Sequence, residues 1–569
     1  MPNALTMTPT LNSIPIRHGD FHTTTEALSY AASGEAGFNF FNASGQLTAV
    51  LDYRRLKLES MRAALYLKQQ GFPRYDRLAL IAETTPEFLI LFFACQYAGL
   101  IPCPVAFSLN PGGMVAYTEK LNLLLDSADA KGVLCSRNIA DAIGSRLSRP
   151  LIVSENILAR ASSLHQPLES ELSPLSPEDP AYIQFSSGST THPKGVLLNQ
   201  RHLETNIHAV LKYGMKLRHE DRSFNWLPFH HNMGLVGFIL ASVYGQRSVD
   251  CLSAEHFVQN PLIWLKLMSQ HKTAITFSPA FGYQLAMKAY AESQDKPSLD
   301  LSSLRVAGIG GDAISAEMLA MFSACFAPSG FQEKAFLPCY GLTETTLAVT
   351  ASDLDTPAAV DTPDDAPEKA IVSCGRVLPG FDIKITEAEG GERLPERMVG
   401  QIWVKGPSVV TGYIDDSESI IFDRDDFMYT GDLGYMSQGL LYISGREKDV
   451  IIVRGRNLWA QDVEWMLQQA APQLAAGSVA AIGLNDAQQE RLAALVSIPS
   501  TVAQDLSALR HLVQSMKSAI ARATGIDAEI IFIAERLPLT SSGKMARAQA
   551  KSAYLANQFT VIHNDEESL

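Results

Sequence analysis

The sequence lacks the features that mark several large classes of protein. Its 569 residues contain only seven cysteines, which stand singly and without a CxxC pair, so neither a disulfide framework nor a cysteine metal site is expected. Residues 1–20 lack the basic and then apolar order of a signal peptide, which predicts a cytoplasmic protein. Charged residues make up only 19% of the chain, and the formal net charge of -14 argues against generic binding of nucleic acid.

An uninterrupted hydrophobic run is also missing. Residues 88–107 are almost wholly apolar and about long enough to cross a bilayer, but polar, glycine and proline residues interrupt them. Thr85 is a good helix cap and Gly99 a good helix end, which predicts a core helix followed by a buried strand over residues 100–105. No stable membrane insertion is therefore expected.

What is present is a long chain in which strands and helices alternate. A length of 569 residues exceeds what one ordinary core supports, so at least two domains are expected. Apolar runs that each precede a helical pattern are typical of parallel sheets covered by helices, and they lie at 78–81, 272–278 and 304–309. Short strands separated by glycine turns predict a smaller barrel or antiparallel unit, at 383–385, 402–404 and 441–443.

The remaining segments complete this outline. Residues 353–367 are dense in Asp, Pro and Ala and predict a surface loop. Residues 449–569 have their own alternation, with a strand at 479–482, a helix at 506–523 and a strand at 529–533. This stretch predicts an autonomous C-terminal domain.

A loop rich in hydroxyl residues and glycine comes after the strand-like residues 182–184. It reads Phe-Ser-Ser-Gly-Ser-Thr-Thr-His-Pro-Lys-Gly over residues 185–195. Backbone N–H groups of such a loop can converge on phosphate oxygens, and Lys194 adds a positive charge. The ordinary P-loop has Gly-Lys followed by a hydroxyl residue, whereas Lys194 precedes Gly195. Taken alone, such a segment is more often an ordinary loop.

The order of residues in this loop resembles the phosphate-binding signature of the adenylate-forming ligases, the family of acyl-CoA synthetases, luciferases and peptide-synthetase adenylation domains. Further motifs occur in the family's order, and chance agreement of so many ordered motifs is remote. The resemblance implies that the nucleotide phosphates contact Ser186, Ser187, Gly188, Ser189, Thr190 and Lys194.

Two motifs resemble the family's adenine-binding segments. Residues 339–345, Cys-Tyr-Gly-Leu-Thr-Glu-Thr, imply that Tyr340 stacks on the purine and that Glu344, with Thr190, helps to hold Mg²⁺ on the phosphates. One carboxylate suffices, because Mg²⁺ is usually held by one or two carboxylates plus phosphates. Residues 310–312 resemble the segment lining the adenine, although a strand-to-helix turn capped by Asp would look the same. The implied nucleotide contacts are Gly310, Gly311, Asp312, Cys339, Tyr340, Gly341, Leu342 and Thr343.

Three motifs in the C-terminal third resemble other family signatures. Residues 429–434 resemble the motif whose aspartate, here Asp432, accepts hydrogen bonds from both ribose hydroxyls. Residues 445–449 resemble the domain junction, which implies Arg446 near ribose or phosphate and Lys448 at the hinge. Residues 538–544 are similar to the catalytic-lysine loop, in which Lys544 would neutralise the charge that builds up as the carboxylate attacks the α-phosphate.

The acid substrate is indicated by a fatty acyl-AMP ligase pattern. Residues 226–235 resemble that branch's W-L-P-x-x-H-D-M-G-L, which implies His231 close to the substrate carboxylate, and Asn232 replaces the usual Asp. Local capping of a helix by these residues is the alternative. Residues 454–464 resemble the same branch, with Ala460 in place of Pro. The Phe-Asp motif that binds an amino acid's ammonium is not found, and the implied acyl contacts are His231, Met233, Gly234 and Phe281.

The resemblance implies an α/β protein of two domains. A large N-terminal adenylation domain of two helix-covered sheets plus a small β-barrel would comprise residues 1–447. A smaller, mobile α+β lid would comprise residues 448–569 and carry Lys544. With His231, Glu344 and Lys544 as catalytic residues, the enzyme would convert a medium- or long-chain fatty acid and MgATP to acyl-AMP and pyrophosphate. It would then pass the acyl group to the phosphopantetheine thiol of a separate acyl carrier protein.

The sequence leaves alternatives to this function. The resemblance to acyl-AMP ligases implies an inserted segment that obstructs the domain rotation used with coenzyme A. The corresponding segment, residues 348–371, is present but short, so coenzyme A is an alternative acceptor. A carrier protein could dock on local basic charge, or that charge could simply be a solvated face; the residues are Arg446, Arg454, Arg456, Arg547 and Lys551. A non-catalytic homologue that binds nucleotide or acyl adenylate is the alternative from another class, motivated by Asn232, Asp312 and Ala460.

Overall fold

The computed structural model describes residues 5–107, 113–185, 194–362, 370–387, 391–414, 420–453, 456–471, 473–474, 477–486, 489–499, 506–540 and 544–564. These residues form two compact units. The first unit holds most of the chain up to Ile443, and the second begins at Ser444 and includes Gly431–Gly434. The predicted domain boundary after residue 447, and the mobility of the C-terminal part, stay predictions.

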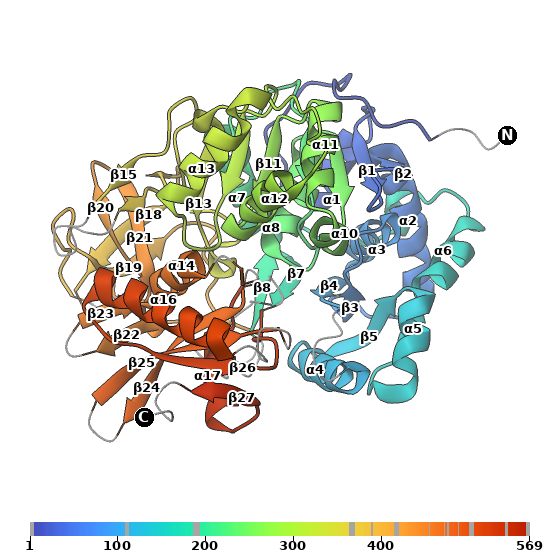
Figure 1. Cartoon of the computed structure of the whole chain (residues 1–569). Helices are drawn as coiled ribbons and strands as arrows, with labels where there is room; N and C mark the ends of the chain where they lie inside the picture. The colour runs from blue at the N-terminus through green and yellow to red at the C-terminus, as the bar shows by residue number, and fades with distance from the viewer. Residues whose placement is uncertain are drawn as a thin grey trace. The chain divides into compact units, whose positions relative to one another are not determined.

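A nine-stranded sheet organises the first unit (Figure 1). The strands from β13 to β1 run parallel, while β2, β14 and β17 pair antiparallel at the edges. In spatial order the strands are β17 (Arg376–Val377), β14 (Thr350–Ala351), β13 (Phe336–Tyr340), β12 (Val306–Ile309), β11 (Ile275–Ser278), β9 (Ser223–Asn225), β10 (Val249–Leu252), β1 (Gly37–Phe41) and β2 (Leu47–Asp52). Helices α11 (Leu262–His271), α12 (Ala280–Glu292) and α13 (Ala316–Phe326) lie along this sheet (Figure 1).

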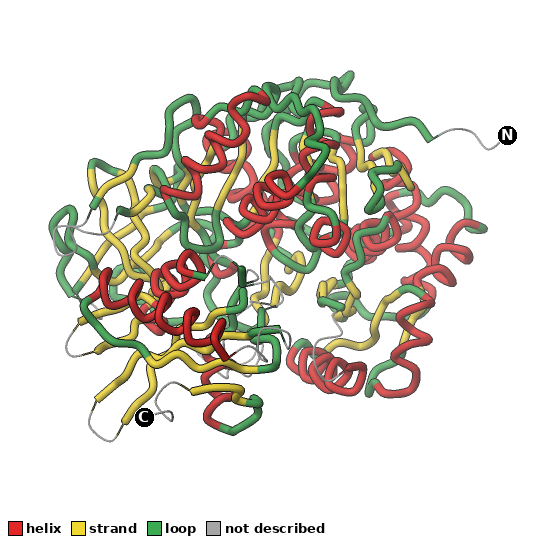
Figure 2. Tube along the Cα trace, in the orientation of Figure 1, coloured by secondary structure: helices red, strands yellow, loops and turns green. Residues whose placement is uncertain are grey.

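A second, four-stranded parallel sheet lies in the same unit. Its order is β4 (Ile101–Val105), β3 (Arg77–Ile81), β5 (Ala130–Cys135) and β6 (Leu151–Val153). The helices between and beside these strands are α2 (Tyr53–Gln69), α3 (Pro86–Ala98), α4 (Gly113–Ser127), α5 (Arg137–Ile143) and α6 (Ser154–Ser162) (Figure 2). The prediction of two helix-covered sheets is thus confirmed at the level of an α/β fold with several sheets.

Helix α3 shows why the apolar run is not a membrane span. The Thr85 side chain accepts a hydrogen bond from the N–H of Phe88, and Gly99 ends the helix at a φ of 75°. Every residue from Phe88 to Ala98 is buried against protein. Among the described residues, none of the helices is both long and apolar enough to span a membrane.

Two smaller groups of strands complete the first unit. β7 (Pro180–Phe185) and β8 (Gly195–Asn199) pair antiparallel and lead into α7 (Gln200–Ala209). Where the sequence predicts a small barrel, the described strands form a sheet in the order β18 (Asp382–Thr386), β19 (Gly400–Lys405), β20 (Met428–Ser437) and β21 (Leu440–Arg446). The predicted loop at 353–367 contains the two-residue strand β15 (Val360–Asp361), which pairs with β16 (Ile371–Val372).

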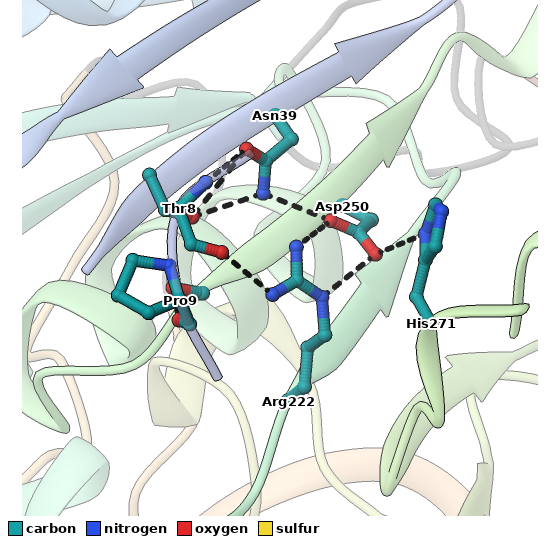
Figure 3. Close-up of polar contacts among 7 residues, drawn as sticks. Thr8, Pro9, Asn39, Arg222, Asp250 and His271 are labelled. Carbon is teal, nitrogen blue, oxygen red and sulfur yellow. Dashed lines mark hydrogen bonds and ion pairs between the residues drawn. The ribbon is translucent and has the colours of Figure 1, made fainter. Parts of the chain in front are cut away.

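A buried polar network ties the N-terminal segment to the large sheet near the amino ends of β9, β10 and β1 (Figure 3). The Asp250 carboxylate accepts hydrogen bonds from Arg222 at 2.6 and 2.9 Å, from Asn39 at 2.9 Å and from His271 at 2.9 Å. Arg222 also donates to the Thr8 carbonyl, and the Thr8 N–H donates to Asn39. Burial would raise the pKa of Asp250, but the hydrogen bonds from His271 and Arg222 outweigh it and lower that pKa.

The second unit is an α+β structure with its own core. Its main sheet has the order β24 (Val479–Asp486), β25 (Gln489–Ser497), β26 (Glu529–Ile533) and β27 (Val561–Asn564), and β22 (Val450–Val453) pairs with β23 (Arg456–Trp459). Apolar side chains of α14 (Ala460–Ala470) and α16 (Leu506–Thr524) form one core cluster with these strands. Ala550 on α17 (Arg547–Leu555) packs in another, with Met545 and Tyr554 beside it.

Candidate active site

The parallel strands of the first unit bring several predicted site segments to one edge of the large sheet. β9, β11, β12 and β13 are consecutive neighbours that run in the same direction. Their carboxyl ends lead into Trp226, Pro279, Gly310 and Gly341 respectively. In open α/β sheets, ligands bind outside the carboxyl ends of the strands. The predicted adenine and acyl segments therefore lie where such a fold places its ligands.

The two predicted adenine segments touch one another through glycine. A Cβ atom on Gly310 would lie 2.8 Å from the Cys339 carbonyl oxygen, and one on Gly341 would lie 1.8 Å from the Leu347 carbonyl oxygen. A side chain at Gly310 would therefore push the two segments apart, and one at Gly341 would displace the backbone of Leu347. Tyr340, which ends β13, is 9% exposed, and its side chain belongs to a core cluster of buried apolar residues.

Two other residues of these segments have ordinary local surroundings. None of the seven cysteines, all of them described, forms a disulfide, and burial raises the pKa of the Cys339 thiol to about 12. The Asp312 carboxylate is exposed and accepts a hydrogen bond from the N–H of Ala313. Because α13 is capped by Ser315 instead, Asp312 is not the helix cap that the sequence offered as its alternative interpretation.

Glu344 has a partner that the sequence did not indicate. The carboxylate lies in a 3₁₀ turn, Thr343–Thr345, with Leu342 at its cap position. The Tyr413 hydroxyl donates a hydrogen bond to Glu344 Oε1 at 2.8 Å. The Lys194 ammonium lies 5.1 Å from the centre of the same Tyr413 ring. Tyr413 thus joins the predicted metal carboxylate to the lysine of the predicted phosphate loop.

The backbone holds Tyr413 in this position. Val196 forms an isolated bridge with Tyr413, and the Ile414 N–H donates to the Gly195 carbonyl at 2.9 Å. The segment Thr411-Gly412-Tyr413 resembles an ordinary turn, and nothing local pairs it with Glu344 at a separation of 69 residues. Its partner could be found only from the folded chain.

The turn that carries Glu344 is followed by a strained residue. Thr346 has a φ of 76° although it is β-branched, and it is fully buried. Its hydroxyl donates to the Ser408 carbonyl at 3.0 Å, while the Asn206 amide donates to the carbonyls of Thr345 and Ala348. These bonds compensate a strain of about 1–3 kcal/mol and hold the Glu344 turn in one conformation.

The predicted substrate-carboxylate segment is fixed at both ends. His231 Nδ1 and Asn232 Oδ1 both accept from the N–H of Met233, at 3.3 and 2.9 Å, and His231 is the N-cap of α8 (Asn232–Gly234). The Asn232 amide also donates to the Thr346 carbonyl at 3.4 Å. The departure from the branch's usual Asp therefore links this segment to the Glu344 turn. At its other end, the Gln184 amide donates to the His230 carbonyl at 2.7 Å.

Apolar groups surround the predicted acyl contacts. Trp226 stacks on Phe257 with ring centres 3.9 Å apart, and Phe281 meets the edge of Trp226 at 5.7 Å. Only glycine fits at position 234, because a Cβ atom there would lie 2.2 Å from the Pro228 carbonyl oxygen. Met233 is 9% exposed. No charged residue occurs in residues 226–240.

Part of the predicted phosphate site belongs to residues 186–193, between β7 and β8. Ser186, Ser187, Gly188, Ser189 and Thr190 lie outside the described residues. The strands on either side, β7 and β8, pair directly, so the two ends of this loop are close together. The phosphate and Thr190 metal contacts stay predictions.

The second unit contains the remaining predicted site residues. Arg446 Nε donates to Asp432 Oδ1 at 3.0 Å, which brings together two residues predicted near the ribose. Lys448 lies in the 3₁₀ turn Glu447–Asp449. The Lys544 N–H donates to the Thr540 hydroxyl at 3.1 Å.

Arg547 corrects one sequence hypothesis. Its side chain is only 15% exposed, and it is paired with Asp449 and Glu464 at 2.7 Å each. It is therefore unsuited to the role of a docking charge for an acidic carrier protein. Arg454 and the side chain of Arg456 lie outside the described part of the structure.

Comparisons with known proteins agree with this arrangement. Residues 40–414 match the family model of the AMP-binding enzymes. A protein of Caulobacter vibrioides named as a candidate acyl-CoA synthetase is 37% identical, over 98% of this chain and 100% of its own. A medium-chain-fatty-acid–[acyl-carrier-protein] ligase of Moorena producens is 28% identical, over 94% of this chain and 95% of its own.

A solved structure is similar to this chain over almost its whole length. It comes from a study of fatty acyl-adenylate ligases from E. coli and L. pneumophila and has a TM-score of 0.85 with 37% identity. The match covers 96% of this chain and 100% of the other. The chain therefore belongs to the family of AMP-binding enzymes, the ATP-dependent ligases that form adenylates and release AMP.

Proposed function

We propose that this protein is a fatty acyl-AMP ligase that delivers its acyl group to an acyl carrier protein. A medium- or long-chain fatty acid reacts with MgATP to give acyl-AMP and pyrophosphate. The phosphopantetheine thiol of a separate carrier protein then attacks the acyl carbon, and AMP leaves. The observation that carries the choice of a fatty acid is the stretch of residues 226–240 beside the Glu344 turn, which has no Asp, Glu, Lys or Arg and is wholly apolar from Met233 to Leu240.

This stretch favours an aliphatic acid for a physical reason. The ammonium of an amino acid requires a nearby carboxylate, because an unpaired buried charge costs several kcal/mol. Residues 237–240, Gly-Phe-Ile-Leu, offer only apolar side chains, and Phe238 is 1% exposed. An alkyl chain gains about 0.8 kcal/mol for each CH₂ group that it buries in such surroundings.

The residues around the nucleotide have separate tasks in the first half-reaction. A carboxylate oxygen of the acid forms a bond to the α-phosphorus, and the bond from that phosphorus to the pyrophosphate breaks. Lys194 would bind the phosphates, and Lys544 would neutralise the charge that develops on the transferring group. Asp432, which is 5% exposed, would accept hydrogen bonds from the ribose.

The donor set suits Mg²⁺ that arrives with ATP. Among the described residues, no group of three or more His, Cys, Asp or Glu side chains could hold a metal ion. Glu344 alone is a single hard carboxylate, oriented by the Tyr413 hydroxyl at 2.8 Å, and it would complement an ion held mainly by phosphate oxygens. Bound there, Mg²⁺ would offset the negative charge of the phosphates.

Two observations bear on the acceptor. A relative that is 28% identical over 94% of the chain is named as a ligase for acyl carrier protein, which supports the carrier. A relative that is 37% identical is named as a candidate acyl-CoA synthetase, which keeps coenzyme A as the alternative. The short segment 348–371 also keeps coenzyme A as the alternative acceptor.

One experiment tests both halves of the proposal. Enzyme, MgATP and dodecanoate are incubated with either coenzyme A or a phosphopantetheinylated carrier protein, and pyrophosphate and thioester are measured separately. We expect pyrophosphate with acid alone and thioester only with the carrier. Efficient acyl-CoA formation would refute the carrier as acceptor while leaving adenylation intact. If wild-type enzyme fails to exchange pyrophosphate into ATP with any fatty acid, the non-catalytic alternative is correct instead.

A further inference from the structure

Arg547 is held by two carboxylates close to Lys544 in the second unit. It begins α17, three residues after Lys544. Its guanidinium donates to both oxygens of Glu464, from Nε at 2.8 Å and from the terminal nitrogen at 2.7 Å. The other terminal nitrogen donates to Asp449 Oδ2 at 2.7 Å. Such a planar, bidentate arrangement fixes orientation as well as distance, which an ammonium cannot do.

The two carboxylates come from separate parts of the unit. Glu464 lies on α14 and also accepts the N–H of Ala481 on β24 at 3.0 Å, so it is held by the body of the unit. Asp449 ends the 3₁₀ turn Glu447–Asp449 and comes directly after Lys448, the predicted hinge. Arg547 therefore joins the end of the Lys544 loop both to α14 and to the residue after that hinge.

The loop that carries Lys544 is closed at its base. Leu539 forms an isolated bridge with Met545, and the Ala546 N–H donates to the Pro538 carbonyl at 3.0 Å. The Thr540 N–H donates to the Lys544 carbonyl at 2.7 Å, so Lys544 is the first residue of the second paired arm. Arg547 is the next residue along the chain after these paired arms, so its ion pairs set the direction in which the arms point.

Apolar contacts that do not involve Arg547 pack α17 on the sheet. Ala550 is fully buried in a core cluster with residues of β24, β25 and β26, and Met545 and Tyr554 pack against the same cluster. Apolar burial of this kind holds the helix without specifying its rotation or register closely. A buried arginine paired with two carboxylates adds little net stability to the fold, but it fixes the relative orientation of the segments that it joins.

We propose that Arg547 is a positioning residue that holds Lys544 in the geometry required for adenylation. The inference rests on the proposed function, because it takes Lys544 as the cation of the first half-reaction. Since Lys544 acts only while the phosphorus–oxygen bonds change, a loss of register at Arg547 affects that half-reaction and leaves transfer of the acyl group from acyl-AMP unchanged.

The test separates the two half-reactions. Arg547→Lys keeps the charge but removes the planar, two-nitrogen contact with Glu464, and Arg522→Lys at an exposed position of α16 is the matched control. Adenylation is measured as acid-dependent exchange of pyrophosphate into ATP, and transfer is measured from chemically prepared acyl-AMP to the acceptor thiol. We expect Arg547→Lys to lower kcat for exchange about a hundredfold, with KM for ATP and the transfer rate unchanged within about threefold. Arg522→Lys should match wild type in both assays.

A second comparison keeps the inference falsifiable if Arg547→Lys is poorly stable. Lys544→Ala and the double variant Lys544→Ala/Arg547→Lys should exchange pyrophosphate at the same residual rate, because a positioning residue has nothing left to position. A further loss in the double variant, or an equal fall of both half-reactions in Arg547→Lys, would show a merely structural role. Absence of exchange in wild type would instead overturn the proposed function itself.

Discussion

Replacing Tyr413 with phenylalanine removes the hydroxyl that holds Glu344 and leaves the ring that faces Lys194. The lost hydrogen bond is 2.8 Å long, half-buried and made to a carboxylate. Hydrogen bonds to charged groups contribute about 1.5–3 kcal/mol, and half-burial favours the lower end. A loss of about 1.5 kcal/mol in the transition state corresponds to about a tenfold lower rate.

The assay is acid-dependent exchange of pyrophosphate into ATP over a range of Mg²⁺ concentrations. We expect Tyr413→Phe to lower kcat about tenfold and to raise the Mg²⁺ concentration needed for half-maximal rate, with KM for the fatty acid unchanged. Tyr413→Leu also removes the ring beside Lys194 and should lose more. Tyr66→Phe on α2 is the control. A wild-type rate for Tyr413→Phe at every Mg²⁺ concentration would refute the role assigned to this hydroxyl.

Other substitutions test the remaining features. Lys544→Ala should lower pyrophosphate exchange by about a hundredfold or more, and near-normal exchange would contradict its role as the adenylation cation. Asp250→Ala leaves Arg222, which is 2% exposed, without its carboxylate and should destabilise the first unit by about 3–5 kcal/mol, seen as a lower melting temperature. Because the folded pKa of Asp250 is lowered, its stabilisation is complete above about pH 4 and is lost as pH falls through the folded value. Asp250→Asn should therefore flatten the dependence of melting temperature on pH below about pH 4, and an unchanged slope would contradict this assignment.

Local chemistry explains which elements the sequence could predict. Helix α3 begins at Pro86 and ends at Ala98 as its cap and glycine predict, because capping involves only residues within one turn. Strand β26 covers Glu529–Ile533, the predicted range, because a run of β-branched and aromatic residues is itself the signal. The short strand β15 was missed, since two residues carry no periodicity and are a strand only through pairing with β16.

The candidate site shows the same difference between local motifs and contacts of distant residues. Glu344 and His231 could be predicted as site residues because each lies within a motif of consecutive residues. The contacts of Tyr413 and Arg547 could not be predicted from the sequence, because Glu344 lies 69 residues from Tyr413 and Glu464 lies 83 residues from Arg547. Arg547 was moreover grouped with exposed basic residues, since composition alone does not distinguish a buried arginine from a solvated one.

The contact between Thr8 and Arg222 has a consequence for how the chain is made. The two residues are 214 positions apart, and Thr8 also bonds to Asn39 in the same buried network. During synthesis the N-terminal segment leaves the ribosome long before Arg222 and Asp250 exist to receive it. Its final position is therefore reached only after most of the first unit has been translated. Long-range closure of this kind slows folding and makes premature release of a truncated chain costly.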